Sequence, residues 1–157
     1  MKLSYHSVVL FVKDIKKSKS FYNDVMSIET EMDMGENVIL RNGITLWQVS
    51  KNHIIPQTVG LNKMKEKGYA FELCFETEDI KEIRSIVDVN HIPLVHDILE
   101  EPWGQFTLRV YDQDQNIVEI GETLKCFLTR MKSNGLSNEQ MSTKTGMKTE
   151  DIARAIG

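Results

Sequence analysis

The chain has 157 residues, of which 41% are hydrophobic and 27% charged, so its composition is that of a globular protein. This length suits one ordinary domain with at most a small appendage. No apolar run approaches the roughly 20 residues of a bilayer-spanning helix, and the first residues lack a secretory signal, so we expect a cytoplasmic protein without a membrane anchor. The two cysteines, Cys74 and Cys126, are too few for a disulfide framework, and we expect both to be reduced core thiols.

Charge divides the chain near Thr123. Residues 1–122 hold 13 Lys and Arg against 20 Asp and Glu, whereas residues 123–157 hold 6 against 3. The change of sign coincides with a change from strand-like to helical patterns. We therefore expect a domain over residues 1–122, followed by a basic helical extension over residues 123–157.

An internal repeat with an offset of 65 residues organises the predicted domain. The segment Phe11–Lys17 matches the segment Glu76–Glu82. In both copies an apolar strand precedes an aspartate, Asp14 or Asp79, that can cap a helix. Apolar residues then follow at helical spacing, as they do along residues 80–87. Each copy is therefore predicted to contain a strand followed by a helix.

Strand-like runs separated by turn signals follow each predicted helix. They cover residues 37–40 and 44–49 in the first copy, and residues 106–111 and 116–120 in the second. The repeated unit is thus β-α-β-β with room for one more strand. Module one is predicted to span about residues 1–55 and module two about residues 68–122, and His53 is expected in a loop over residues 50–60.

Alternation along two strands predicts which polar side chains share a face. The polar sides consist of Glu72, Cys74 and Glu76 on one strand, and of Thr107, Arg109 and Tyr111 on another. The apolar sides should meet the helices. A sheet of this kind either curves around a cavity or exposes a solvated back, and alternation by itself leaves both arrangements open.

Three stretches, residues 6–22, 71–80 and 101–120, resemble the vicinal oxygen chelate superfamily of glyoxalases, bleomycin-resistance proteins and extradiol dioxygenases. The helical Ser-x-x-Phe-Tyr at Ser18–Tyr22 and the last strand with Glu119 are typical of this group. The resemblance implies an α+β fold in which two tandem βαβββ modules form a curved, incompletely closed eight-stranded mixed sheet. It also implies a homodimer with a small-molecule pocket that often holds a divalent metal ion.

In the metal-using members of this superfamily, one ligand comes from the first strand and one from the last strand of each module. In module two, Glu119 stands where the family glutamate stands, and Glu72 stands where relatives commonly have histidine. The resemblance therefore implies that Glu72 and Glu119 are metal ligands and catalytic residues.

Module one matches the superfamily pattern less closely. Trp47 occupies the position where metalloenzymes usually have glutamate, with Gln48 beside it. Ser7 falls at the other ligand position, and His6 lies one residue away. Because a shift of one residue turns a side chain to the other face of a strand, His6 can be a ligand only if a bulge intervenes.

A ligand set of His6, Gln48, Glu72 and Glu119 would be a mixed N/O site suited to Zn, Mn, Ni, Fe or Co. The ion would polarise a substrate oxygen while a carboxylate moves a proton. The alternative is that His6 is structural and that the two glutamates are acids of a metal-free pocket.

Further candidate residues could bind the substrate. Arg109 could hold a carboxylate or phosphate in bidentate fashion, or could form an ion pair with Glu72 or Glu119. Tyr111 lies on the same predicted face, and Trp103 and Trp47 could form an aromatic wall. We expect Cys74 to be structural, because neighbouring carboxylates raise the pKa of a thiol.

The extension is predicted to contain three short helices. The first has an apolar stripe at residues 124, 127, 128 and 131, which the domain, a second subunit or the following residues must cover. Ser137 and Gln140 have the spacing of a capping box at the start of the second helix, and Gly146 ends it. Thr149 is expected to cap the third helix.

Residues 137–156 resemble the two-helix core of a helix-turn-helix, with Gly146 in the turn. The would-be recognition helix carries Glu150 and Asp151 at its N-terminal end, where they would repel the phosphates of DNA. We therefore expect the extension to pack or to make dimer contacts rather than to bind nucleic acid.

Three functions follow as hypotheses. The first is a glyoxalase-like protein with a small-molecule pocket and metal-assisted lyase, isomerase or transferase chemistry. The second is a metal-free protein that sequesters a ligand, for which an acidic pocket of Glu72, Glu76 and Glu119 would suit a cation. The third is a ligand-sensing regulator that uses its helix-turn-helix-like extension.

Overall fold

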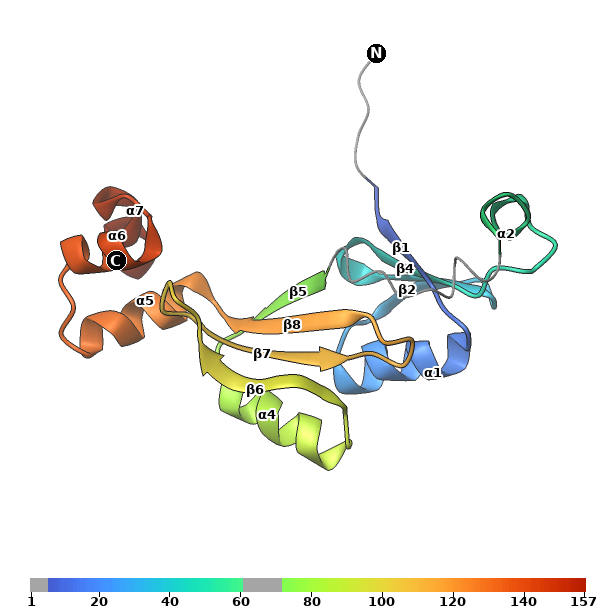
Figure 1. Ribbon diagram of the computed structural model, residues 1–157, viewed down its shortest axis with the longest axis horizontal. Helices are drawn as coiled ribbons and strands as arrows, with labels where there is room; N and C mark the ends of the chain where they lie inside the picture. The colour runs from blue at the N-terminus through green and yellow to red at the C-terminus, as the bar shows by residue number, and fades with distance from the viewer. Residues whose placement is uncertain (1–5, 61–71) are drawn as a thin grey trace, which may run out of the picture. The chain divides into compact units, whose positions relative to one another are not determined.

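The computed structural model describes residues 6–60 and 72–157 (Figure 1). The chain forms two compact units. Unit 1 comprises Met1–Ala70 and the loop Asp112–Asn116, and unit 2 comprises Phe71–Tyr111 and Ile117–Gly157. Among the described residues, no helix is long and apolar enough to cross a bilayer.

Unit 1 contains the first predicted module. Its elements are β1 (Val8–Phe11), α1 (Ile15–Ser20), a π-helical turn η1 (Phe21–Val25), β2 (Thr30–Asp33), β3 (Asn37–Leu40), a short 3-10 turn η2 (Arg41–Gly43), β4 (Ile44–Trp47) and α2 (Ile54–Val59). The sheet has the strand order β1-β4-β3-β2. In it β1 is parallel to β4, and the other neighbours are antiparallel.

Unit 2 repeats this plan and adds the C-terminal helices. Its elements are β5 (Glu72–Thr77), α4 (Ile80–Val89), β6 (Leu94–Glu100), β7 (Phe106–Tyr111), β8 (Ile117–Glu122), α5 (Leu124–Ser133), α6 (Asn138–Thr145) and α7 (Thr149–Ile156). The strand order is β5-β8-β7-β6, with β5 parallel to β8. The predicted α+β fold of two βαβββ modules and C-terminal helices is confirmed, and each module forms a four-stranded mixed sheet.

The two helices that follow the first strands begin with the same cap. The carboxylate of Asp14 accepts hydrogen bonds from the backbone N–H groups of the second and third residues of α1, and Asp79 does the same for α4. Both aspartates have an extended backbone, as a residue preceding a helix should. The caps predicted from the repeat are therefore confirmed in both modules.

A buried tyrosine joins η1 of unit 1 to the loop Asp112–Asn116. The side chain of Tyr22 is fully buried, and its hydroxyl donates to Asp112 at 2.9 Å. Asp112 also accepts from the backbone N–H groups of Asp114 and Asn116, which fixes the loop. Burial, and next the charge of Asp112, raise the pKa of Tyr22, so the phenol stays protonated and keeps donating.

The predicted alternation along β5 is confirmed in unit 2. Leu73 is buried, whereas Glu72, Cys74 and Glu76 are exposed on the opposite face. Figure 1 shows α4 lying along one side of this sheet. The expectation that Cys74 is a core thiol is wrong, because its strand turns it to the polar face; Cys126 is partly buried, and both cysteines are free.

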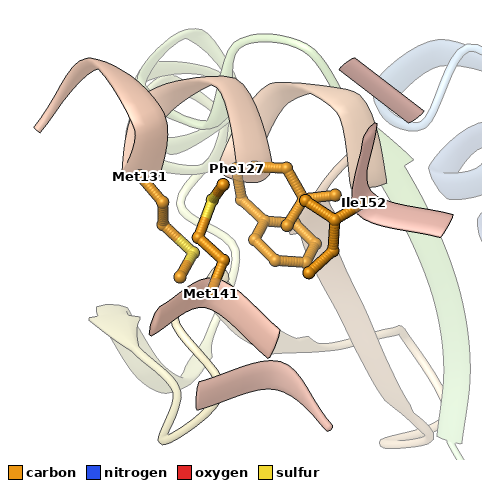
Figure 2. Close-up of a cluster of buried hydrophobic side chains, with 5 residues drawn as sticks. Phe127, Met131, Met141 and Ile152 are labelled. Carbon is orange, nitrogen blue, oxygen red and sulfur yellow. The ribbon is translucent and has the colours of Figure 1, made fainter. Parts of the chain in front are cut away.

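The apolar stripe of α5 is covered by the two helices that follow it. Phe127, Leu128 and Met131 of α5 form one buried cluster with Met141 of α6 and Ile152 of α7 (Figure 2). All five side chains are at most 5% exposed. The extension thus has a small hydrophobic core of its own.

The caps of the extension match the prediction at one helix and differ at the next. Ser137 and Gln140 form the predicted capping box of α6, and Gly146 ends that helix in the left-handed conformation. Thr149 was expected to cap α7, but it is the first helical residue. Lys148 is the N-cap residue instead, and its side chain makes no hydrogen bond to the first turn.

The expected loop over residues 50–60 contains the helix α2. His53 is its N-cap, and the imidazole Nδ1 accepts from the backbone N–H of Ile55 at 3.2 Å. Pro56 lies in the first turn, where a missing N–H costs no helical hydrogen bond. These two residues are the signal by which the sequence could have indicated this helix.

Candidate functional site

The polar side chains of unit 2 gather on the face of its sheet opposite α4. In the strand register, Cys74 of β5 lies opposite Glu119 of β8, which lies opposite Arg109 of β7. Glu72 precedes Cys74 by two residues and therefore shares its face. Two adjacent strand pairings thus bring the predicted residues Glu72, Arg109 and Glu119 together.

The guanidinium of Arg109 lies among three carboxylates. Its Nε donates to Glu72 at 2.8 Å, its Nη1 donates to Glu101 at 2.8 Å, and its Nη2 donates to Glu119. We call Glu72, Glu101, Arg109 and Glu119 the Arg109 cluster. Because three carboxylates surround one guanidinium, the cluster has a net negative charge.

His96 of β6 completes the hydrogen bonds of the guanidinium. Its Nε2 lies 3.0 Å from Nη1 of Arg109, and its Nδ1 lies 2.8 Å from the carbonyl oxygen of Asp97. An arginine only donates and a carbonyl only accepts, so Nε2 accepts and Nδ1 carries the hydrogen.

Glu101 comes from the turn between β6 and β7, which we define as residues 100–105 and which begins with Glu100, the last residue of β6. Its carboxylate accepts from Arg109 and from the hydroxyl of Thr107 at 2.9 Å, and its side chain is 13% exposed. The hydrogen bond from Arg109 is the main reason that the pKa of Glu101 lies below its usual value. Sequence reasoning missed both Glu101 and His96; the signal was a central arginine on a polar face, which needs counter-charges from neighbouring elements.

Cys74 lies between the two predicted acidic ligands. One ligand atom each from Glu72, Cys74 and Glu119 lies within 4.8 Å of the others. Partial desolvation, and next the charge of Glu72, raise the pKa of the Cys74 thiol. The thiol is therefore protonated at neutral pH and is a poor nucleophile, as the sequence predicted.

The predicted ligands of module one lie in unit 1 and bond to other partners. The side-chain oxygen of Gln48 accepts a hydrogen bond from the backbone N–H of Ile15 at 2.8 Å and so satisfies a donor in the first turn of α1. His6 is exposed before β1, with its Nδ1 3.1 Å from the hydroxyl of Ser7. The pairing of β1 with β4 is continuous from Val8 to Phe11.

Trp47 lies in an aromatic group of unit 1. Its ring centroid is 5.9 Å from that of Phe11 and 5.0 Å from that of His53, which meets it edge-on. By register, Thr45 is opposite Val9, as Glu119 is opposite Cys74 in module two. The counterpart of Glu119 in module one is therefore Thr45, a buried and neutral side chain.

A divalent metal ion, which the superfamily implies, has to be tested against these donors. In unit 2, Glu72 and Glu119 both accept hydrogen bonds from Arg109, and the thiol between them is protonated. In unit 1, Gln48 serves a helix end. A metal ion coordinated by both Glu72 and Glu119 would have to displace the guanidinium from both carboxylates, so the described residues do not fit a dedicated metal site.

Two tandem βαβββ modules with a polar face on one sheet define a class of small-molecule-binding folds. The chain belongs to the glyoxalase-like domain family, whose model matches residues 5–125, and thus to the vicinal oxygen chelate superfamily. The superfamily resemblance of the sequence is confirmed. The matched region ends within α5, so α6 and α7 lie outside it.

Several solved structures share this fold. A protein of unknown function from Agrobacterium tumefaciens is 25% identical, with a TM-score of 0.65 over 79% of this chain and 97% of that chain. A lactoylglutathione lyase from the same organism is 22% identical (TM-score 0.54; 76% and 93% covered). A glyoxalase-related enzyme from Fulvimarina pelagi is 19% identical (0.64; 78% and 89%). No curated protein matches this chain.

Proposed function

We propose that this chain is a small-molecule-binding protein of the glyoxalase-like family that recognises a positively charged ligand at the Arg109 cluster without a metal ion. The observation that carries the proposal is the convergence of Glu72, Glu101 and Glu119 on a single arginine. One guanidinium neutralises only one of three carboxylates, so the face attracts cations. The sequence led to the same metal-free hypothesis with a cationic ligand, but with Glu76 in the place that Glu101 takes in the cluster.

Glu72 is the residue that a ligand would meet first. Its side chain is 34% exposed, whereas the side chains of Glu101 and Glu119 are 13% and 14% exposed. An ammonium group can bind to Glu72 while Arg109 stays bonded to the two less exposed carboxylates, Glu101 and Glu119. The ligand cation therefore adds to the cluster without dismantling it.

An exposed aromatic side chain in the turn that carries Glu101 suits a ligand with a flat or cationic part. Trp103 is 39% exposed in the turn that carries Glu101, and its indole N–H donates to Gln105 at 3.0 Å, which orients the ring. Such a ring attracts a cation through its face. We propose Trp103 and Tyr111 as ligand contacts, because Trp103 belongs to the turn of Glu101 and Tyr111 shares the strand face of Arg109. Trp47 belongs to unit 1, and its contact with a ligand stays a prediction from the sequence.

The ion pairs of the basic extension argue against nucleic-acid binding. Arg130 pairs with Glu122, Lys144 pairs with Glu100, and Arg154 pairs with Asp151. These pairs leave less positive charge for phosphates, which favours a packing role over the regulator hypothesis. The homodimer that the superfamily implies is tested by the mass of the protein in solution.

The ligand class can be tested with a matched set of ring compounds that carry an ammonium, a hydroxyl or a carboxylate group. We expect calorimetric titration to detect the amines, with weaker binding at high salt and about tenfold weaker binding to Glu72→Gln. Glu82→Gln, the same change on exposed α4, should bind as the natural chain does. A preference for carboxylates, or no binding by any class, would overturn the proposal.

Metal-assisted chemistry is the second candidate, and it requires Arg109 to release Glu72 and Glu119, whose donor atoms lie within 4.8 Å of each other and of Cys74. Elemental analysis of protein purified without chelator separates the candidates. Stoichiometric metal that Glu119→Ala loses would favour the lyase, isomerase or transferase hypothesis, with Glu72 and Glu119 as the catalytic residues. Metal-free protein that binds amines would favour the first candidate.

A further inference from the structure

The turn between β6 and β7 connects the Arg109 cluster to the C-terminal helices. Glu101 of this turn reaches Arg109 on the polar face. Glu100 and Gly104 of the same turn contact α6 and α5. The turn therefore bonds to the Arg109 cluster and also to α5 and α6, which extend beyond the region that the family model matches.

Two residues of the helices bond directly to the turn. Arg130 of α5 donates from Nη2 to the carbonyl of Gly104 at 2.7 Å, and Lys144 of α6 donates to Glu100 at 2.6 Å. A Cβ atom on Gly104 would lie 2.9 Å from the sulfur of Met131. The turn thus packs so closely on α5 that a side chain at this position would require Met131 to shift, and the φ of +99° also favours glycine.

Arg130 also holds the end of β8 and the start of β7 together. Its Nε and Nη2 donate to Glu122 at the end of β8, at 2.9 and 2.6 Å. The same carboxylate accepts the backbone N–H of Phe106 at the start of β7, at 2.8 Å. The guanidinium lies 3.8 Å from the centroid of the Phe106 ring. With the Glu122 side chain only 5% exposed, this pair is a strong local restraint.

The turn passes this restraint to Glu101 through its backbone. Glu101 donates its N–H to Gln105 at 2.8 Å and accepts at its carbonyl from Gly104 at 2.8 Å. The side chain of Gln105 in turn donates to the carbonyl of Glu122 at 2.7 Å. Moving Gly104 therefore moves the backbone that carries Glu101.

We propose that the C-terminal helices position Glu101 in the Arg109 cluster through Arg130 and Lys144, and that they thereby set the affinity of the site for its ligand. Arg130 is the main positioning residue, because it holds Gly104, Phe106 and Glu122 together. The statement about affinity rests on the proposed function. The statement about Glu101 does not, since it can be measured without a ligand.

The test compares Arg130→Met and Lys144→Met with Lys132→Met, the same change at an exposed position of α5. NMR follows the titration of the Glu101 carboxyl carbon and the Nε–H signal of Arg109 in the full chain. We expect the titration midpoint of Glu101 to rise by about one pH unit in Arg130→Met and by less in Lys144→Met. Lys132→Met should leave the midpoint and the Arg109 signal unchanged.

The methyl signal of Met141, in the core of the extension, reports whether each variant is folded. If Arg130→Met unfolds, Lys144→Met decides the question, because its ion pair is partly exposed and its loss is mild. An unchanged Glu101 midpoint and an unchanged Arg109 signal in the folded variants would overturn the positioning role. If the affinity for amines falls in the variants whose Glu101 midpoint rises, both parts of the proposal are supported. If the Glu101 midpoint rises but the natural chain binds no amine, only the proposed function is overturned.

Discussion

The two modules share a backbone plan and differ in the chemistry of one sheet face. In module two, Cys74, Glu119 and Arg109 lie side by side across three strands. The residues at the same register positions of module one are Val9, Thr45 and Ile39. The repeat therefore preserves strands, helices and caps, whereas a few outward side chains decide which module can hold charge.

The most severe way to test this difference is to remove the arginine. Arg109→Met should destabilise the protein by about 3 kcal/mol, because it leaves three carboxylates together without their cation. Urea unfolding measures the loss. Ile39→Met, at the matching register position of module one, should cost less than about 1 kcal/mol. Equal losses in the two variants would contradict the contrast between the faces.

A second test concerns the buried hydrogen bond of unit 1 that joins a tyrosine of module one to a loop of module two. Tyr22 donates to Asp112, whereas its counterpart at the repeat offset is the apolar Val87. Tyr22→Phe should cost about 1–2 kcal/mol, because a buried carboxylate loses a donor. A double-mutant cycle with Asp112→Asn measures the coupling by urea unfolding. Additive losses would show that the two side chains do not interact.

The shared caps offer a test in which the modules should behave alike. Asp14→Ala and Asp79→Ala should each cost about 1 kcal/mol, because both carboxylates accept two N–H groups of a first helical turn. Thermal unfolding compares the two variants. The variants Asp14→Asn and Asp79→Asn should keep most of the stability that the alanine variants lose. A cap that matters in one module alone would break the equivalence of the repeat.

The smallest expected effect is a pH dependence. The pKa of Glu101 is lowered in the folded chain, so its contribution to stability is complete above the usual glutamate pKa of about 4.3 and is lost as the pH falls through the lowered value. Glu101→Gln should therefore flatten the acid-side decline of the melting temperature. Glu82→Gln on α4 is the control, and a decline in Glu101→Gln as steep as in the natural chain would refute the assignment.

Local patterns carried the sequence predictions that the structure confirms. The caps at Asp14 and Asp79, the alternation along β5 and the capping box of Ser137 each depend on residues within a few positions of one another. Short-range sterics and hydrogen bonds suffice to set such features. The helix α2 was missed because His53 is an uncommon capping residue.

The tertiary structure alone decided which side chains meet around Arg109. Glu101 comes from a turn and His96 from a neighbouring strand, and β6 pairs with β7 through register shifts that no local pattern encodes. The structure likewise turned Gln48 to the end of α1. Sequence periodicity fixes the face on which a side chain lies, but the partner across that face depends on long-range strand register and on contacts from distant segments.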